Sequence, residues 1–228
     1  MFRRTTIGTL TALLLLTSTV VQADFRAKEK RGTLQITGTG PGTVLFITED
    51  YGQVVVVSAF GSDIVDQELT QIQSFDASEI TGVSVKLGTH SVAMMLMDGQ
   101  DVQVKGGGAA EFILVSGEVG NLDISSGGGN DYVFVADVEV LGDAEVNTGG
   151  GHDICTVAFA TFFGAVDIAL GGGDDELFVP FASLSHSTDI CFNGGGGDDY
   201  ADIGWTDIDL TEFLKKFEDE VVEDGIEI

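Results

Sequence analysis

Short stretches of alternating apolar and polar residues recur about every 22 residues through the second half of the chain. This alternation has the period of a β-strand with one buried face. Before each of four glycine triplets, the inward sets are Leu122, Ile124 and Ser126; Ala144, Val146 and Thr148; Val166, Ile168 and Leu170; and Thr188, Ile190 and Phe192. After the triplets, the inward pairs are Val133 and Val135; Cys155 and Val157; Leu177 and Val179; and Ala201 and Ile203. The pattern predicts two strands in every repeat.

A third short stretch completes each repeat. This stretch is visible in Val138 and Val140, in Phe159 and Thr161, and in Phe181 and Ser183. A second column of turns falls at Gly120, Gly142 and Gly164. A fixed period of this length is typical of a solenoid, in which each repeat stacks on the last. The sequence therefore predicts an all-β fold, a parallel β-helix or β-roll-like solenoid.

The regular repeats are assigned to residues 81–205, including an early coil with Glu111 in the turn position and another with Val92 there. Residues 24–80 are interpreted as an N-terminal β cap or as irregular first coils, because a solenoid needs its end coils covered. Residues 206–228 are expected to form an acidic C-terminal helix and tail that caps the last coil. The helix would begin at Asp209 or Thr211, with one apolar face made of Leu210, Phe213, Leu214, Phe217 and Val221.

Residues 1–23 have the features of a secretory signal peptide. Arg3 and Arg4 precede an apolar run, and Val21-Gln22-Ala23 is a small-residue cleavage site. The apolar run is short and rich in threonine for a membrane span. We therefore expect export to the extracellular space or the periplasm, with no membrane span after cleavage.

Charge limits the partners. Removal of the two arginines leaves 8 basic and 37 acidic residues, a formal charge of −29. Nucleic acid is excluded, because phosphate binding needs a basic surface. The 43% of apolar residues indicates a folded core despite the acidity. We assign Cys155 an inward position and Cys191 the outward column of Ser125, Asn147 and Ala169, so a disulfide between the two cysteines is disfavoured.

Each glycine triplet ends in a turn that carries one or two acidic residues. The turns continue as Asn130-Asp131, His152-Asp153, Asp174-Asp175 and Asp198-Asp199. Stacking would place these carboxylates about 4.8 Å apart, where two of them repel by roughly 3 kcal/mol at an effective dielectric of 20. No lysine or arginine occurs between Gly106 and Leu214, against twenty Asp and Glu. The repeat therefore predicts a bound cation, and oxygen ligands favour Ca²⁺. The alternative is that the turns are sharp corners in which Asp bonds to turn amides.

The turns resemble the nonapeptide G-G-x-G-x-D-x-U-x of hemolysin-type (RTX) calcium-binding repeats. Residues 194–202 fit that pattern in full, and the other three copies fit from the second glycine onward. The resemblance covers about residues 105–205 and implies that calcium lies between consecutive turns and is needed for folding. Three features depart from the family: one turn per 22 residues instead of one per 9, the missing first glycine of three copies, and an N-terminal rather than a C-terminal export signal.

The resemblance implies the ligand set. It assigns the side-chain ligands to Asp131, Asp153, Asp175 and Asp199, with Asp174 and Asp198 as additional charge. It assigns the carbonyl ligands to the turn glycines Gly127, Gly129, Gly149, Gly151, Gly171, Gly173, Gly195 and Gly197. A second acidic column, Asp123, Glu145, Asp167 and Asp189, is interpreted as a solvated outer face.

Parallel β-helices include polysaccharide lyases and hydrolases, so catalysis is the competing hypothesis. A lyase would need an Arg or Lys near the aspartates. Hydrolysis by Asp174/Asp175 or Asp198/Asp199 would need two different carboxyl environments. His90, His152 and His186 are isolated. The sequence favours a secreted, non-catalytic, calcium-binding structural or adhesion module, with extracellular polysaccharide or cell-surface components as partners. The alternative is a carbohydrate-active enzyme or a sugar-binding protein.

Overall fold

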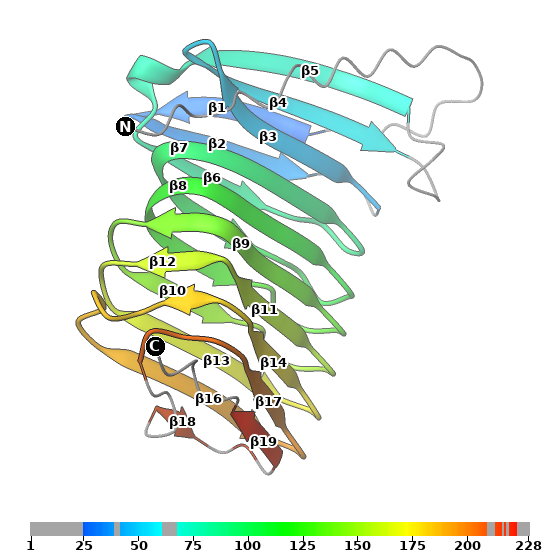
Figure 1. Cartoon of the computed structure of the whole chain (residues 1–228). Helices are drawn as coiled ribbons and strands as arrows, with labels where there is room; N and C mark the ends of the chain where they lie inside the picture. The colour runs from blue at the N-terminus through cyan, green and yellow to red at the C-terminus, as the bar shows by residue number, and fades with distance from the viewer. Residues whose placement is uncertain are drawn as a thin grey trace.

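The computed structural model describes residues 25–38, 42–60, 68–208, 213–215, 217 and 219–222. They form a parallel β-solenoid whose coils stack along one axis from the N-terminal to the C-terminal end (Figure 1). The predicted all-β fold is confirmed. The proposed signal peptide lies outside the described residues. No helix in the described part of the chain is long and apolar enough to cross a membrane.

Each regular coil has three sides, which we call A, B and C. Side A contains β2 (Thr33–Gly38), β6 (Gly82–Lys86), the C-terminal parts of β7 (Val92–Lys105) and β8 (Phe112–Ser125), β10 (Ala144–Asn147), β13 (Val166–Gly172), β16 (Ile190–Gly196) and β18 (Leu214–Lys215). Side B contains β3 (Val44–Asp50), the N-terminal parts of β7, β8 and β9 (Tyr132–Val140), β11 (Ile154–Ala158), β14 (Glu176–Val179), β17 (Tyr200–Ile203) and β19 (Asp219–Val222). Side C is short and contains the end of β9, β12 (Ala160–Phe162) and β15 (Ala182–Ser183).

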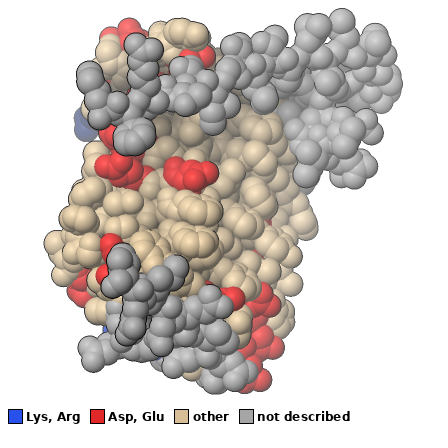
Figure 2. All heavy atoms as spheres, viewed as in Figure 1, with Lys and Arg blue, Asp and Glu red and all other residues tan. Residues whose placement is uncertain are grey.

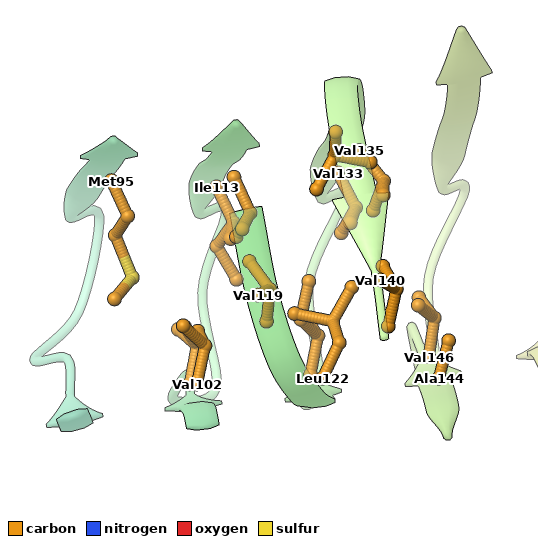
Figure 3. Close-up of a cluster of buried hydrophobic side chains, with 14 of the residues drawn as sticks. Met95, Val102, Ile113, Val119, Leu122, Val133, Val135, Val140, Ala144 and Val146 are labelled. Carbon is orange, nitrogen blue, oxygen red and sulfur yellow. The ribbon is translucent and has the colours of Figure 1, made fainter. Parts of the chain in front are cut away.

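The core follows from the repeat register. Ala144 pairs with Leu122 in one neighbouring coil and with Val166 in the other, so equivalent residues stack in columns. Figure 3 shows Ile113 and Val133 of side B directed toward Leu122 and Ala144 of side A. These side chains are buried, and burial of apolar surface is the main driving force for the fold.

The N-terminal segment contains both a regular coil and an antiparallel end. β2 and β3 pair in parallel with β6 and β7, which makes them the first coil. β1 (Phe25–Lys30) covers the edge of β2 in antiparallel orientation. β4 (Gln53–Phe60) and β5 (Glu68–Asp76) extend antiparallel from β3, and the 3-10 helix η1 (Ala77–Glu79) leads back to the solenoid (Figure 1).

The C-terminal capping helix is not present in the described residues, and its prediction was wrong. Leu214 pairs in parallel with Phe192, and Asp219 pairs with Tyr200, so the chain begins another coil as β18 and β19. Phe213, Leu214 and Phe217 still pack against the core. The exposed edges of β16 and β17 offer unpaired backbone groups, and pairing with them outweighs a weak local helix propensity. Residues 209–212 and 223–228 lie outside the described part.

Side C shows which residues of the third stretch face the core. Phe159 is 61% exposed and Phe181 is 50% exposed, whereas Ala160, Phe162 and Ala182 are buried. Both exposed phenylalanines have a positive φ, 53° and 61°. This left-handed residue turns the chain between sides B and C. It also shifts the alternation of inward and outward side chains by one position, and strand periodicity alone does not reveal that shift.

The last repeat is two residues longer, and the sequence placed the extra residues in the wrong position. Ile190 pairs with Val166 and Cys191 with Asp167, so the insertion precedes Ile190. Thr188, assigned inward, is exposed. Cys191 therefore belongs to the column of Asp167 and not to that of Ala169. Cys155 is buried and Cys191 half-buried, and both are free thiols.

Candidate functional site

Four aspartates lie inside the corner between sides A and B. Asp131, Asp153, Asp175 and Asp199 are at most 1% exposed, and Glu111 occupies the equivalent position of the preceding coil at 2%. Each residue directly precedes a strand of side B that is paired in register with its neighbours. The structure therefore brings these five acids into one column, which we call the buried acid column.

Backbone hydrogen bonds fix one oxygen of each aspartate. The N–H of Asp131 donates to Oδ1 of Asp153 over 2.8 Å, and that of Asp153 donates to Oδ1 of Asp175 over 2.8 Å. The same contact joins Glu111 to Asp131 at 2.8 Å and Asp175 to Asp199 at 3.0 Å. Each aspartate thus fastens its own coil to the preceding one through an inward-facing main-chain N–H that would otherwise be buried without a partner.

The other carboxyl oxygens are buried without hydrogen-bond partners. They are Oδ2 of Asp131, Asp153 and Asp175. The hydroxyls of Ser126 and Thr148 lie beside Asp131 and Asp153. They donate, however, to the carbonyls of Thr148 and Leu170 at 2.9 and 2.6 Å. A buried ionised oxygen without a partner is costly, so the column needs either protons or a cation.

The same burial changes the acidity of the column. Burial raises the pKa of Asp131 and Asp153, although the N–H donors from the preceding coil lower it in part. Burial raises the pKa of Asp175 to about 6, and the charges of Asp153 and Asp199 add to the effect of burial. Burial followed by the charge of Asp131 raises the pKa of Glu111 to about 7. At neutral pH the ionised column is therefore electrostatically unfavourable.

The column continues toward the N-terminus as uncharged hydroxyl residues. The N–H of Val92 donates to the carbonyl of Thr43, and that of Phe112 donates to the carbonyl of Ser91, just as Tyr132 donates to Glu111. Thr43 and Ser91 are both buried. The equivalent of Glu111 in the earlier coil is therefore Ser91, and the assignment of Val92 was one residue too late. Only the C-terminal coils carry charge in this column.

A second ladder faces outward, one residue before the buried column. The N–H of His152 donates to Oδ1 of Asn130 at 3.0 Å, and that of Asp198 donates to Oδ1 of Asp174 at 3.0 Å. Between them, the N–H of Asp174 contacts Nδ1 of His152 at 3.3 Å. These side chains accept from the following coil, whereas the buried aspartates accept from the preceding one. Asp174 and Asp198 are exposed, on the side of the backbone opposite to Asp175 and Asp199.

The turn glycines are required by close packing of consecutive turns. Gly171 and Gly173 have φ values of 106° and 136°, which side chains rarely adopt. A Cβ atom on either residue would overlap the carbonyl oxygen of Gly149 or Gly151 in the preceding coil. The middle glycines Gly128, Gly150, Gly172 and Gly196 continue the ladder, with hydrogen bonds of 2.8 Å from Gly151 to Gly172 and from Gly173 to Gly196.

Of the two kinds of cation ligand that the sequence implied, carboxyl oxygens and turn carbonyls, the carboxyl oxygens fit better. The carboxyl oxygens without partners supply the negative charge that calcium needs. Among the implied carbonyl ligands, Gly127 and Gly149 accept hydrogen bonds from Gly150 and Gly172 instead. Within the described residues, no group of three or more His, Cys, Asp and Glu is arranged to hold a metal ion. The carboxylates of the column would therefore hold a cation, with less help from the turn carbonyls than the sequence implied.

The outer acidic column has three of its four predicted members. Asp123, Glu145 and Asp167 stand side by side on side A, and Glu145 and Asp167 are exposed. Asp189 is exposed but precedes the strand, because Cys191 pairs with Asp167. In Figure 2, acidic residues also gather at the lower right, over the turns that lead into β14 and β17.

The proposed catalytic pairs do not converge on a shared site. Asp174 is exposed and Asp175 buried, as are Asp198 and Asp199, so the backbone separates the two members of each pair. The described residues have two notable depressions. One, of about 330 Å³, is lined by Arg26, Lys28, Gln35 and Thr37. The other, of about 240 Å³, lies beside Phe181 and Trp205, and the sequence did not indicate it.

None of the protein-family models, curated proteins or solved structures compared with the chain matches it. The fold is therefore established by the structure alone as a β-solenoid built of repeats. The resemblance to hemolysin-type repeats stays a prediction.

Proposed function

We propose that the chain is an exported, non-catalytic β-solenoid that calcium stabilises, acting as an extracellular structural or adhesion module. The observation that carries the proposal is the buried acid column. Asp131, Asp153 and Asp175 contribute inward carboxyl oxygens without hydrogen-bond partners, and the sequence between Gly106 and Leu214 contains no lysine or arginine that could neutralise them.

Calcium would replace the missing positive charge. Asp131, Asp153, Asp175 and Asp199 would hold it, with Glu111 at the N-terminal end of the column. A cation bound only by the folded chain stabilises it, by about 2.7 kcal/mol at a concentration a hundredfold above the dissociation constant. Asp174 and Asp198 would bind a cation only weakly, because exposed carboxylates are screened by water and salt.

A scaffold role is supported by the way the chain uses its acidic residues. The buried aspartates join coils through the backbone N–H groups, and the outward ladder does the same in the opposite direction. Both ladders serve coil stacking. A stiff rod with exposed sides suits display or adhesion to polysaccharide or other cell-surface components.

Calcium-dependent melting tests the proposal. We expect the purified chain, first treated with chelator, to melt several degrees higher in millimolar calcium chloride than in the same concentration of magnesium chloride, because Mg²⁺ gives up its water ligands reluctantly. Circular dichroism at increasing temperature measures this. Identical melting curves with calcium, with magnesium and with chelator would contradict the proposal.

An activity assay separates the enzyme hypothesis. Reducing sugars and unsaturated uronates would be measured after incubation with acidic polysaccharides. Product release that disappears in Asp175→Ala, while circular dichroism shows that the variant is still folded at the assay temperature, would favour a lyase or hydrolase. We expect no product.

A further inference from the structure

Two exposed phenylalanines hold an unusual backbone conformation at the corner between sides B and C. Phe159 and Phe181 both have left-handed φ values, and more than half of Phe159 is in solvent. Such a conformation is rare for a bulky residue and costs energy unless its surroundings fix it. Asp137, one coil earlier, has the same conformation with a φ of 51°, so the conformation belongs to the corner, and in the two later coils the corner residue carries an exposed ring.

The rings form a row that ends at Trp205. The centroids of Phe159 and Phe181 are 5.1 Å apart, and their planes differ by 8°. Ala182 forms a parallel bridge with Thr206, which brings Trp205 to the coil beside Phe181. Trp205 is 42% exposed and is the only tryptophan of the chain.

A depression of about 240 Å³ lies at this end of the row. It is lined by Phe178, Pro180, Phe181, Asp202, Gly204 and Trp205. Asp202 pairs with Phe178 across β14 and β17, so a carboxylate stands next to an aromatic ring on the outer face. The site thus combines three aromatic side chains with one negative charge.

The rim of the depression is held in place before any ligand binds. Asp207, two residues after Trp205, accepts hydrogen bonds from the N–H groups of Leu184 and Ser185 at 2.7 and 3.1 Å. Its other oxygen accepts from the hydroxyls of Ser183 and Ser185 at 2.6 and 2.8 Å. These four bonds fix the segment that carries Trp205 against side C. A rigid aromatic rim lowers the entropy cost of binding.

We propose that this depression binds an organic cation, specifically a methylated ammonium group. Aromatic faces attract cations through the ring quadrupole, and quaternary ammonium ligands are recognised by aromatic cages. Asp202 adds charge complementarity, and the field of a chain with a formal charge of −27 favours positive ligands over neutral ones. A sugar would need several donors and acceptors, but the lining side chains supply only the indole N–H and the Asp202 carboxylate.

The single tryptophan gives a direct measurement. Fluorescence of Trp205 would be followed while the purified chain, in constant calcium, is titrated with choline chloride. A parallel titration uses 3,3-dimethylbutan-1-ol, which has the shape of choline without its charge. We expect choline to bind about fivefold more tightly than the alcohol, and sodium chloride at equal ionic strength to give no saturable change.

Two variants assign the binding to this site. Asp202→Asn should weaken choline about fivefold and leave the alcohol unchanged, whereas Phe181→Leu should weaken both. Glu176→Gln, an exposed acid on β14 outside the lining, is the matched control and should change neither. Equal responses to choline and the alcohol would overturn the proposal. So would choline binding unaffected by Asp202→Asn, or a saturable response to methyl glucoside and not to choline. None of these outcomes depends on calcium binding in the buried acid column.

Discussion

Two columns of acidic residues run along the solenoid at the same spacing, and the backbone directs them to opposite environments. Asp131, Asp153 and Asp175 lie inside the corner, each with one oxygen that has no hydrogen-bond partner. On the outer face of side A, Glu145 and Asp167 are in solvent. Spacing alone therefore does not make a charge functional. A buried charge must be compensated, whereas an exposed one is screened.

The two columns should differ most in how much stability is lost when one acid of each column is replaced by alanine. Asp153→Ala eliminates the acceptor for the N–H of Asp131 and leaves that group buried. We expect a loss of about 2–3 kcal/mol in the free energy of unfolding, measured in calcium by urea denaturation. Glu145→Ala is the control on the outer column and should change stability by less than about 0.5 kcal/mol. Equal effects would mean that the two columns are not energetically different.

A substitution in the buried acid column that removes a charge but keeps the side-chain shape should stabilise the chain in chelator, whereas Asp153→Ala destabilises it. Asp175→Asn retains an oxygen that can accept from the N–H of Asp153, but it removes a carboxylate whose burial raises its pKa. In chelator at pH 7.5, we expect the variant to melt about 2–4 °C above the unchanged chain. In calcium it should lose most of the calcium-dependent gain.

Asp167→Asn is the matched variant on the outer face. It should alter neither the melting temperature in chelator nor the gain from calcium. If Asp175→Asn keeps the whole gain, the buried acid column is not the calcium site.

The pH dependence should follow the buried column. An acid with a raised folded pKa binds more protons in the folded state, so stability falls as pH rises between the unfolded and folded pKa values. For Asp175 these are 3.8 and about 6, and for Glu111 they are 4.5 and about 7. In chelator, the contribution of these two acids to the melting temperature should therefore be largest below about pH 4 and should be lost progressively until about pH 7. Calcium should flatten this slope, because it neutralises the ionised form. A melting temperature that rises steadily from pH 5 to 8 in chelator would contradict the assignment.

The alternating stretches around the glycine triplets predicted the coils, because strand period and repeat period agree there. The column of Asp131 to Asp199 was predicted for the same reason. The sequence did not predict that this column is buried, because the side chain of a residue that follows a left-handed glycine can lie on either side of the backbone. The separation of Asp174 from Asp175 has the same origin.

Three other features lay beyond sequence periodicity. The outward aromatic row depends on left-handed residues at Phe159 and Phe181, which the strand pattern treats as ordinary positions. The longer last repeat has two places for its extra residues, and only pairing of Ile190 with Val166 decides between them. The apolar residues near Leu214 fit a helix or a strand equally well until the edge of β16 is known.

The smallest effect should come from the outward ladder, which separates stacking from charge. Asp174→Asn keeps an oxygen that can accept from the N–H of Asp198, and its side chain is 60% exposed. We expect a change in the free energy of unfolding within about 0.5 kcal/mol, with calcium or with chelator. Asp174→Ala, which removes the acceptor, should cost somewhat more, about 0.5–1 kcal/mol, because water can replace part of the bond. If Asp174→Asn instead removed the stabilisation by calcium, the cation would lie on the outer side of the turns, and the buried acid column would hold protons.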